Sequence, residues 1–247
     1  MDSISHKICL VRRKNPDKVR SGSIVAPITP HIQSRLANQF RNMERAEQLR
    51  LYNFFAKVPE SRKMAGVFYE ALVQQHFQEK ISLSIIPMVK LDRREPTQKS
   101  KMPRWYTSHV LLTNPELEAL RQNALRHVIS INIVPSRTEE FTDNGPSHIE
   151  QDVLYIPEAT NHESLDLFIW HGDHLYFFQF TISEEHDGVK PRVFLFFNRF
   201  PNIPQVSNWR FVFIIEPNLI LKSPQPWALD LRGVPLFSAV VDVCQQQ

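Results

Sequence analysis

A β-hairpin predicted over residues 165–181 constrains the fold of this chain more than any other stretch. Its sequence is LDLFIWHGDHLYFFQFT, two apolar and aromatic-rich runs on either side of Gly172-Asp173. A glycine followed by a polar residue suits a two-residue type II′ turn between neighbouring antiparallel strands. Such a turn fixes the register of the two strands. The residue numbers of any two paired residues add up to the sum of 172 and 173, the numbers of the turn residues.

This register brings polar side chains together on two otherwise apolar strands. Asp166 is predicted to lie opposite Gln179, and Thr181 shares their face because side chains alternate along a strand. An acidic residue in such a strand needs a hydrogen-bonding partner or a function. Asp166, Gln179 and Thr181 therefore form the first candidate site.

These three residues have the spacing of an acid, acid-x-Lys metal site. An Asp opposite a second acid can hold a divalent cation, because hard cations take several oxygen ligands at once. A Lys two residues after the second acid would orient water and stabilise developing charge on a phosphate. Here Gln179 stands in the place of the second acid and Thr181 in the place of the lysine.

Composition excludes several other classes of protein. With 247 residues, 42% of them hydrophobic, the chain can bury one sizeable core, and the net charge of +3 says little about partners. Cys9 and Cys244 give neither a disulfide framework nor a metal cluster. The sequence has no glycine-rich phosphate loop, which argues against a P-loop NTPase, and no Ser or Cys nucleophile stands in a recognisable elbow. No small-molecule cofactor is expected.

No secretory leader or transmembrane stretch is recognisable in the sequence. Residues 1–10 are too polar for a leader, so the protein is expected to be intracellular or nuclear and to have no membrane partner.

The N-terminal part is predicted to be an arm followed by helices. Residues 1–30 read as a basic, mostly irregular arm with a short strand near 8–11. Residues 31–58 have helical periodicity that Pro59 ends, and a second helix spans 62–78. Glu70 lies on that second helix, and periodicity alone favours a solvated residue there.

The remaining chain is predicted to alternate between strands and helices, as expected of a mixed α/β layer with a central sheet covered by helices. The predicted elements are a strand at 81–91 whose middle Pro87 makes an edge or a bulge, a helix at 115–125, a strand at 127–134, a polar loop at 136–151, a strand at 153–156, the hairpin, and strands at 210–215 and 237–243. The apolar segment 193–200 is a buried helix or a strand, and a helix is favoured because a long hairpin strand precedes it.

A basic loop in the middle of the chain is a candidate nucleic-acid contact. It ends at Trp105-Tyr106, and basic residues beside aromatic rings suit nucleic acid, since cations bind phosphates and rings stack on bases. A solvated surface loop is an equally good interpretation. The basic residues assigned to nucleic acid are Arg93, Arg94, Lys99, Lys101 and Arg104, with Lys190 after the hairpin.

Four stretches, in this order along the chain, resemble the PD-(D/E)xK nuclease-like C-terminal domain of Crinkler effectors and retrotransposon hot spot proteins. The resemblance covers roughly residues 60–243. The stretches are GVFYEALVQQHF, YIPEATNHESLDLFIW, HLYFFQFTISEEHDGVK and WRFVFIIEP, and the features that carry it are Tyr155-x-Pro157, Asn161, Asp166, Gln179-x-Thr181 and His186.

The resemblance implies a restriction-endonuclease-like mixed sheet with an αβββαβ core flanked by helices. Residues 31–59 would then be a helical extension, and residues 60–247 the nuclease-like domain with an insertion at about 92–126. The implied metal ligands are Glu70 on the first core helix, Asp166 on the second core strand and Gln179 on the third, with Mg²⁺ or Mn²⁺ as the cofactor.

The resemblance also implies a biological setting. Such a domain usually follows a P-loop NTPase domain, so this chain resembles a truncated or free-standing copy. The family is linked to mobile elements and to secreted effectors that act in the host cell nucleus.

Three hypotheses follow from these observations. In the first, the domain hydrolyses phosphodiester bonds, in DNA rather than RNA, with Thr181 and His186 positioning water or phosphate and Lys190 as a further candidate. In the second, the missing acid and lysine leave a degenerate module that holds nucleic acid or a host protein. In the third, Asp166 and Gln179 are a structural hydrogen-bonded pair.

Overall fold

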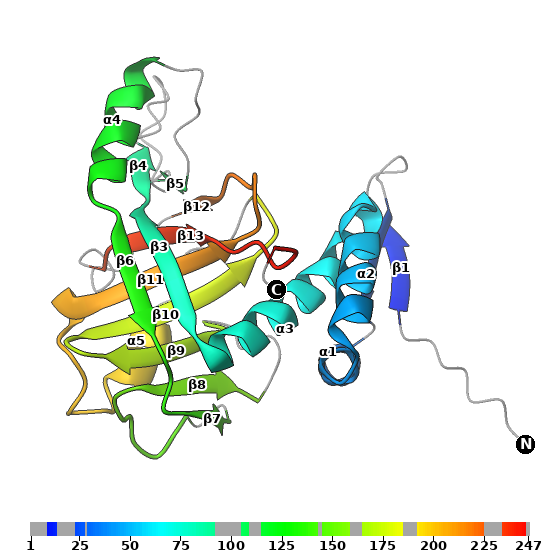
Figure 1. The fold of residues 1–247 in the computed structure, drawn as a ribbon, viewed down its shortest axis with the longest axis horizontal. Helices are drawn as coiled ribbons and strands as arrows, with labels where there is room; N and C mark the ends of the chain where they lie inside the picture. The colour runs from blue at the N-terminus through cyan, green and yellow to red at the C-terminus, as the bar shows by residue number, and fades with distance from the viewer. Residues whose placement is uncertain are drawn as a thin grey trace, which may run out of the picture. The chain divides into compact units, whose positions relative to one another are not determined.

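A computed structural model describes residues 9–13, 23–27, 29–91, 105–108, 115–142, 145–158, 165–184, 192–224 and 234–245. These residues form two compact units that divide between His76 and Phe77, and the described residues from Val243 onward belong to the first unit. The predicted α/β class is confirmed: helices near the N-terminus are followed by a mixed eight-stranded sheet and a small antiparallel sheet (Figure 1).

The first unit holds a strand pair and most of the helical residues. Its elements are β1 (Cys9–Arg13) and β2 (Ser23–Pro27), which pair antiparallel, and the helices α1 (Pro30–Arg41), α2 (Arg45–Ala56), η1 (Pro59–Ser61) and α3 (Arg62–Glu79), whose last residues belong to the second unit. The helical region predicted over 31–58 is thus two helices. Thr29 begins the first, because its hydroxyl accepts the Ile32 N–H at 3.2 Å. Phe40 and Phe68 stack at 4.4 Å between ring centroids.

A curled, mixed sheet forms the centre of the second unit (Figure 1). The strands run in the spatial order β6-β3-β13-β11-β10-β9-β8-β7. Their bounds are β3 Ile81–Pro87, β6 Ile129–Ile133, β7 Arg137–Phe141, β8 Val153–Pro157, β9 Leu167–His171, β10 His174–Thr181, β11 Trp209–Ile215 and β13 Leu236–Val240.

A three-stranded antiparallel sheet and the helix α4 also belong to the second unit. The strands β4 (Val89–Leu91), β5 (Trp105–Thr107) and β12 (Lys222–Pro224) form this sheet, and α4 spans Pro115–Arg126. The single strand predicted over 81–91 is two strands in different sheets, because β3 ends at Pro87 and β4 starts two residues later. Proline has no N–H to donate, so a strand rarely continues through it.

Aromatic side chains pack on both faces of β10. On one face, Phe197 of α5 (Arg192–Phe197) contacts Phe168 and Phe177, at 4.9 and 4.8 Å between ring centroids. On the opposite face, Phe77 contacts Phe178 at 5.4 Å. Large buried rings contribute much apolar area, so these contacts hold the hairpin in the middle of the core.

The predicted hairpin register is confirmed. His171 pairs with His174, and the pairing continues to Leu167 opposite Phe178. Gly172 has φ +54°, a left-handed conformation that glycine adopts without steric cost.

The prediction of one polar loop over 136–151 is wrong, because β7 lies within it. Its sequence is RTEEF, and it pairs parallel to β8 at the edge of the sheet. Charged residues on an edge strand discourage pairing with other chains, and they also remove the hydrophobic alternation that identifies a strand.

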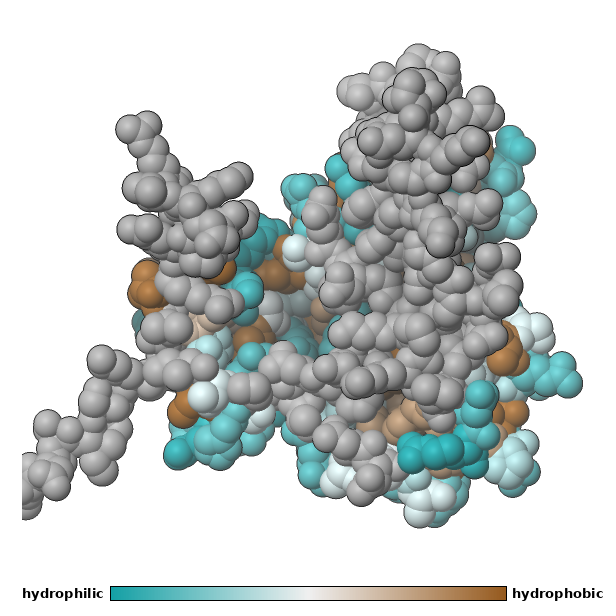
Figure 2. Space-filling model, turned by 180° about the vertical axis from the view of Figure 1, so that it is seen from behind, coloured by the Kyte–Doolittle hydropathy of each residue, from teal (hydrophilic) through white to brown (hydrophobic). Residues whose placement is uncertain are grey.

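The helices and the visible surface can be compared with what a membrane protein requires. None of the helices in the described ranges is both long and apolar enough to cross a bilayer. On the face drawn in Figure 2, described hydrophobic residues are visible as separate spots between hydrophilic ones.

Candidate functional site

Asp166 lies immediately before β9 and is tied to β10 by its backbone and its side chain. Its N–H donates to the Phe178 carbonyl at 3.0 Å. Its Oδ2 accepts the Phe180 N–H at 2.5 Å and the Gln179 amide at 2.9 Å. Asp166 is 7% exposed. The pairing with Gln179 that the register predicts is therefore present, and the carboxylate has an additional backbone donor.

The backbone contact has a simple origin in the hairpin ladder. The regular pairing of β9 with β10 ends at Leu167 and Phe178, while β10 continues to Thr181. The Phe180 N–H therefore lies beyond the paired part of β9. The Asp166 side chain accepts this N–H and extends the ladder by one bond, which satisfies a buried donor.

Gln179 and Thr181 share a face of β10, as predicted. Gln179 is half-buried beside Phe213 of β11, and Thr181 is buried beside Ile215. The Thr181 hydroxyl accepts the Ser183 N–H at 3.0 Å, so it stabilises the chain where it leaves β10. The hydrogen bonds between Gln179, Phe180 and Asp166 are those expected of the structural pair in the third hypothesis.

Asp166 and Gln179 alone fit a divalent metal poorly. Mg²⁺ prefers several oxygen ligands with negative charge among them. Here one carboxylate oxygen already accepts two N–H donors, and the Gln179 amide directs its nitrogen toward that oxygen. Within the described ranges, no three His, Cys, Asp or Glu side chains gather as a metal-binding group.

Glu70 belongs to the first unit and sits in a polar chain there. Gln74 donates to Glu70 Oε1 at 3.3 Å, and Arg41 donates to Gln74 Oε1. Burial raises the pKa of Glu70 to about 7, and the nearby Arg41 charge opposes that rise. The solvated role favoured by periodicity is wrong, since Glu70 is half-buried and hydrogen-bonded. Its predicted convergence with Asp166 and Gln179 remains a prediction.

The other predicted site residues lie outside the described part of the chain. They are His186, Lys190, Arg93, Arg94, Lys99, Lys101 and Arg104, and the family feature Asn161 is outside it too. Their assignments to water positioning and nucleic-acid binding stay predictions.

A polar cluster that sequence reasoning missed lies at the opposite end of the hairpin from Asp166. His171 Nδ1 contacts Asp152 Oδ1 at 2.5 Å, and His148 Nε2 contacts Glu150 Oε1. Arg137 forms an ion pair with Glu150 at 3.0 Å. The only signal in the sequence is the polar run SHIEQD before β8, and its partners come from β7 and β9, which no local pattern links to it.

A pocket of about 310 Å³ lies near this polar cluster and not at the predicted site. It is lined by residues 146–149 and 199–203, and none of Asp166, Gln179 and Thr181 lines it.

Comparison of the chain with family models, with curated proteins and with solved structures finds no match. The resemblance to PD-(D/E)xK nuclease-like domains therefore stays a prediction from the sequence.

Proposed function

We propose that residues 60–243 form a nuclease-like, nucleic-acid-directed domain of the PD-(D/E)xK type whose site is degenerate. The observation that carries this proposal is the position of Asp166 at the start of β9, paired with Gln179 on β10. Those are the second and third core strands that the family resemblance assigns to the site.

The order of the elements supports the same assignment. Three consecutive antiparallel strands, β8, β9 and β10, are followed by α5 and then by β11, which is parallel to β10. This order is the one expected for the βββαβ part of the αβββαβ core that the resemblance implies. The first core helix would be α3, with β3 to β7 and α4 inserted between it and β8. A crossover helix between two neighbouring parallel strands is the ordinary way to build such a unit.

The chemistry of the pair favours holding nucleic acid over cutting it. A glutamate at position 179 would repel Asp166 and leave room for a cation between them. The Gln179 amide instead donates to Asp166, which closes the pair without any metal. Thr181 supplies no positive charge. DNA rather than RNA is the proposed ligand, and the proposed setting is that of an effector or transposon-derived protein in a host cell nucleus.

Two alternatives remain as outcomes of the test. One is an active enzyme that uses Mg²⁺ or Mn²⁺, with Glu70 and His186 completing the site. The other is a module that binds a host protein through the same surface.

DNA binding and cleavage should be measured with the same preparation. Binding of labelled single- and double-stranded DNA is expected, with an affinity that falls steeply as salt rises, because phosphate contacts release counterions. Plasmid should stay intact in Mg²⁺ or Mn²⁺. Cleavage by the native chain and not by Asp166→Asn would overturn the degenerate assignment and establish the hydrolase. No binding at any salt concentration would leave only the protein-binding role.

The basic loop offers a matched test of where DNA binds. The double substitution Arg93→Gln and Arg94→Gln removes two positive charges from the loop. It should weaken binding and lower the salt dependence by about two counterions. The control is Arg121→Gln with Arg126→Gln on α4, which removes the same charge elsewhere. Equal loss in both variants would mean that only net charge matters.

A further inference from the structure

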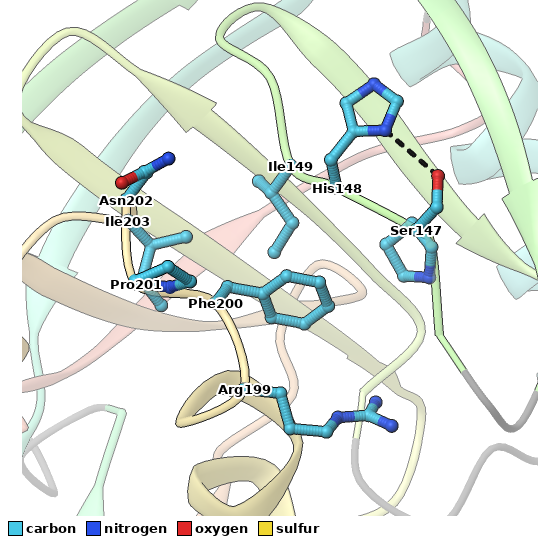
Figure 3. Close-up of a pocket in the computed structure, with 9 residues that line it drawn as sticks. Ser147, His148, Ile149, Arg199, Phe200, Pro201, Asn202 and Ile203 are labelled. Carbon is cyan, nitrogen blue, oxygen red and sulfur yellow. Dashed lines mark hydrogen bonds between the residues drawn. The ribbon is translucent and has the colours of Figure 1, made fainter.

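The pocket of about 310 Å³ is formed by two loops of the second unit (Figure 3). Residues 146–149 lead toward the start of β8, and residues 199–203 follow α5 and lead toward β11. Thr181 is at the far end of β10, the strand that runs parallel to β11 and next to it. The pocket is therefore separate from the Asp166–Gln179 pair and lies near the first residues of β8 and β11.

Hydrogen bonds hold both walls of the pocket in place. In the first wall, the Tyr155 hydroxyl accepts the Glu150 N–H at 2.9 Å and donates to the His148 carbonyl at 3.4 Å. In the second, the Trp209 indole donates to the Pro204 carbonyl at 2.9 Å. Tyr155 and Trp209 are fully buried. The pocket is thus largely preformed, and ordering its walls would cost little free energy when a ligand binds.

Gly145 allows the two walls to approach closely. Its φ is +77°, and a Cβ there would lie 2.6 Å from the Phe196 ring and 2.9 Å from Arg199 Nη2. Any other residue would have to displace this ring and this guanidinium. The positions of Phe196 and Arg199 beside the pocket therefore depend on a glycine.

The polar groups lie at two ends of an apolar surface. The Arg199 guanidinium stacks on Phe196 at 4.8 Å, and its Nε donates to the Phe196 carbonyl. Within the described ranges, no carboxylate pairs with this guanidinium. Figure 3 shows Asn202 on the other side of Phe200 and Ile149 from the Arg199 guanidinium.

We propose that this pocket binds a nucleoside monophosphate, either free or as the terminal nucleotide of a strand. Arg199 takes the phosphate, because a guanidinium matches phosphate oxygens in geometry and charge. The base packs on Phe200 and Ile149, since base stacking on aromatic rings contributes to binding for every base. The Asn202 amide can both donate to and accept from a base edge. Only the strand-terminal form rests on the proposed function.

Calorimetric titration of the full chain tests this proposal. The probes are adenosine, cytidine, guanosine and uridine monophosphates, with inorganic phosphate and the parent nucleosides alongside. The native chain should bind a monophosphate more tightly than phosphate or nucleoside. Arg199→Gln should weaken monophosphate binding roughly tenfold or more, because it removes charge-assisted hydrogen bonds. Arg121→Gln, which removes a positive charge on α4, should bind like the native chain.

A second variant tests recognition of the base. Asn202→Ala should change the order of affinities among the four monophosphates and leave phosphate binding unchanged. The proposal is overturned if inorganic phosphate binds as tightly as every monophosphate, if Arg199→Gln has no effect, or if no monophosphate binds.

The free and strand-terminal forms are separated by oligonucleotides with and without a 5′-phosphate. Arg199-dependent preference for the phosphorylated strand supports the terminal form. Monophosphate binding without such a preference supports the free nucleotide. Loss of all DNA binding with retained monophosphate binding would overturn the proposed function and leave this pocket standing, and the reverse result would overturn the pocket alone.

Discussion

Asp166 and Glu70 each accept a hydrogen bond from a glutamine, and their remaining contacts differ. Asp166 in the second unit accepts Gln179 at 2.9 Å and the Phe180 N–H at 2.5 Å. Glu70 in the first unit accepts Gln74 at 3.3 Å, and the acceptor atom of Gln74 is directed to Arg41. The first carboxylate completes a backbone ladder, whereas the second has only one long hydrogen bond among the described residues.

This difference assigns the two groups different physical roles. A buried N–H that loses its acceptor keeps the full cost of desolvation, so Asp166 is part of what holds the hairpin together. Glu70 satisfies no backbone group in the described structure, and burial raises its pKa to about 7. Asp166 is thus predicted to affect stability at any pH near neutrality, and Glu70 to make stability depend on pH.

The largest effect is expected from Asp166→Ala. This change leaves the buried Phe180 N–H and the half-buried Gln179 amide without their acceptor, which should cost about 3 kcal/mol of unfolding free energy. Urea unfolding followed by tryptophan fluorescence measures it. Gln179→Ala, which removes one donor and leaves the ladder bond, should cost about 1 kcal/mol. Equal losses in the two variants would show that the backbone contact adds nothing.

Glu70 should make stability fall as the pH rises from about 4.5 to about 7. Its pKa is higher in the folded state than its ordinary value of 4.5, so the folded protein binds the extra proton in this range. The stabilisation is complete below the unfolded pKa and is lost as the pH passes the folded one. Because Glu70 keeps some exposure to solvent, the expected loss is on the order of 2 kcal/mol.

The matched variant for this prediction is Glu70→Gln. It keeps the shape and the acceptor for Gln74 and removes the titration. Unfolding free energies measured from pH 4 to pH 8 should be flatter for the variant than for the native chain. Parallel curves would rule out Glu70 as the titrating group.

The comparison also shows what the sequence could predict. A two-residue turn fixes every pairing in the hairpin, so the Asp166–Gln179 pair follows from residue numbers alone. The bond from the Phe180 N–H does not follow, because it depends on where β9 stops pairing and on the direction of one side chain. Local spacing thus predicts which residues meet, but not which of their atoms.

The same limit applies to Glu70 and to β7. Gln74 is four residues after Glu70, so their contact could be expected on a helix. Arg41, on α1, comes near Glu70 only through packing of the helices, and packing rather than periodicity decides that Glu70 is half-buried. β7 was missed because a charged edge strand that pairs parallel to β8 has no local signal.

Gln179→Glu should increase the affinity of the pair formed by residues 166 and 179 for a divalent metal ion. The change removes an N–H donor and places two carboxylates side by side, which should cost about 1 to 2 kcal/mol at pH 8 and less at pH 5. Millimolar Mg²⁺ should raise the thermal midpoint of this variant and not that of the native chain. Gln179→Met, which loses the donor without adding charge, is the control. A rise of the thermal midpoint of the native chain in Mg²⁺ would contradict the conclusion that Asp166 and Gln179 fit a divalent metal poorly.

The smallest effect is expected from Arg41→Gln, which tests how the charge of Arg41 affects the pKa of Glu70. The Arg41 charge lowers the pKa of Glu70 against the larger effect of burial. Without that charge the pKa should rise further, so the fall in stability should begin and end at higher pH than in the native chain. At low pH the variant should lose only about 0.5 to 1 kcal/mol, from the hydrogen bond to Gln74. Arg35→Gln, on the same helix, is a charge-matched control and should leave the pH range unchanged. A shift to lower pH in Arg41→Gln would mean that Arg41 acts on Glu70 through packing and not through its charge.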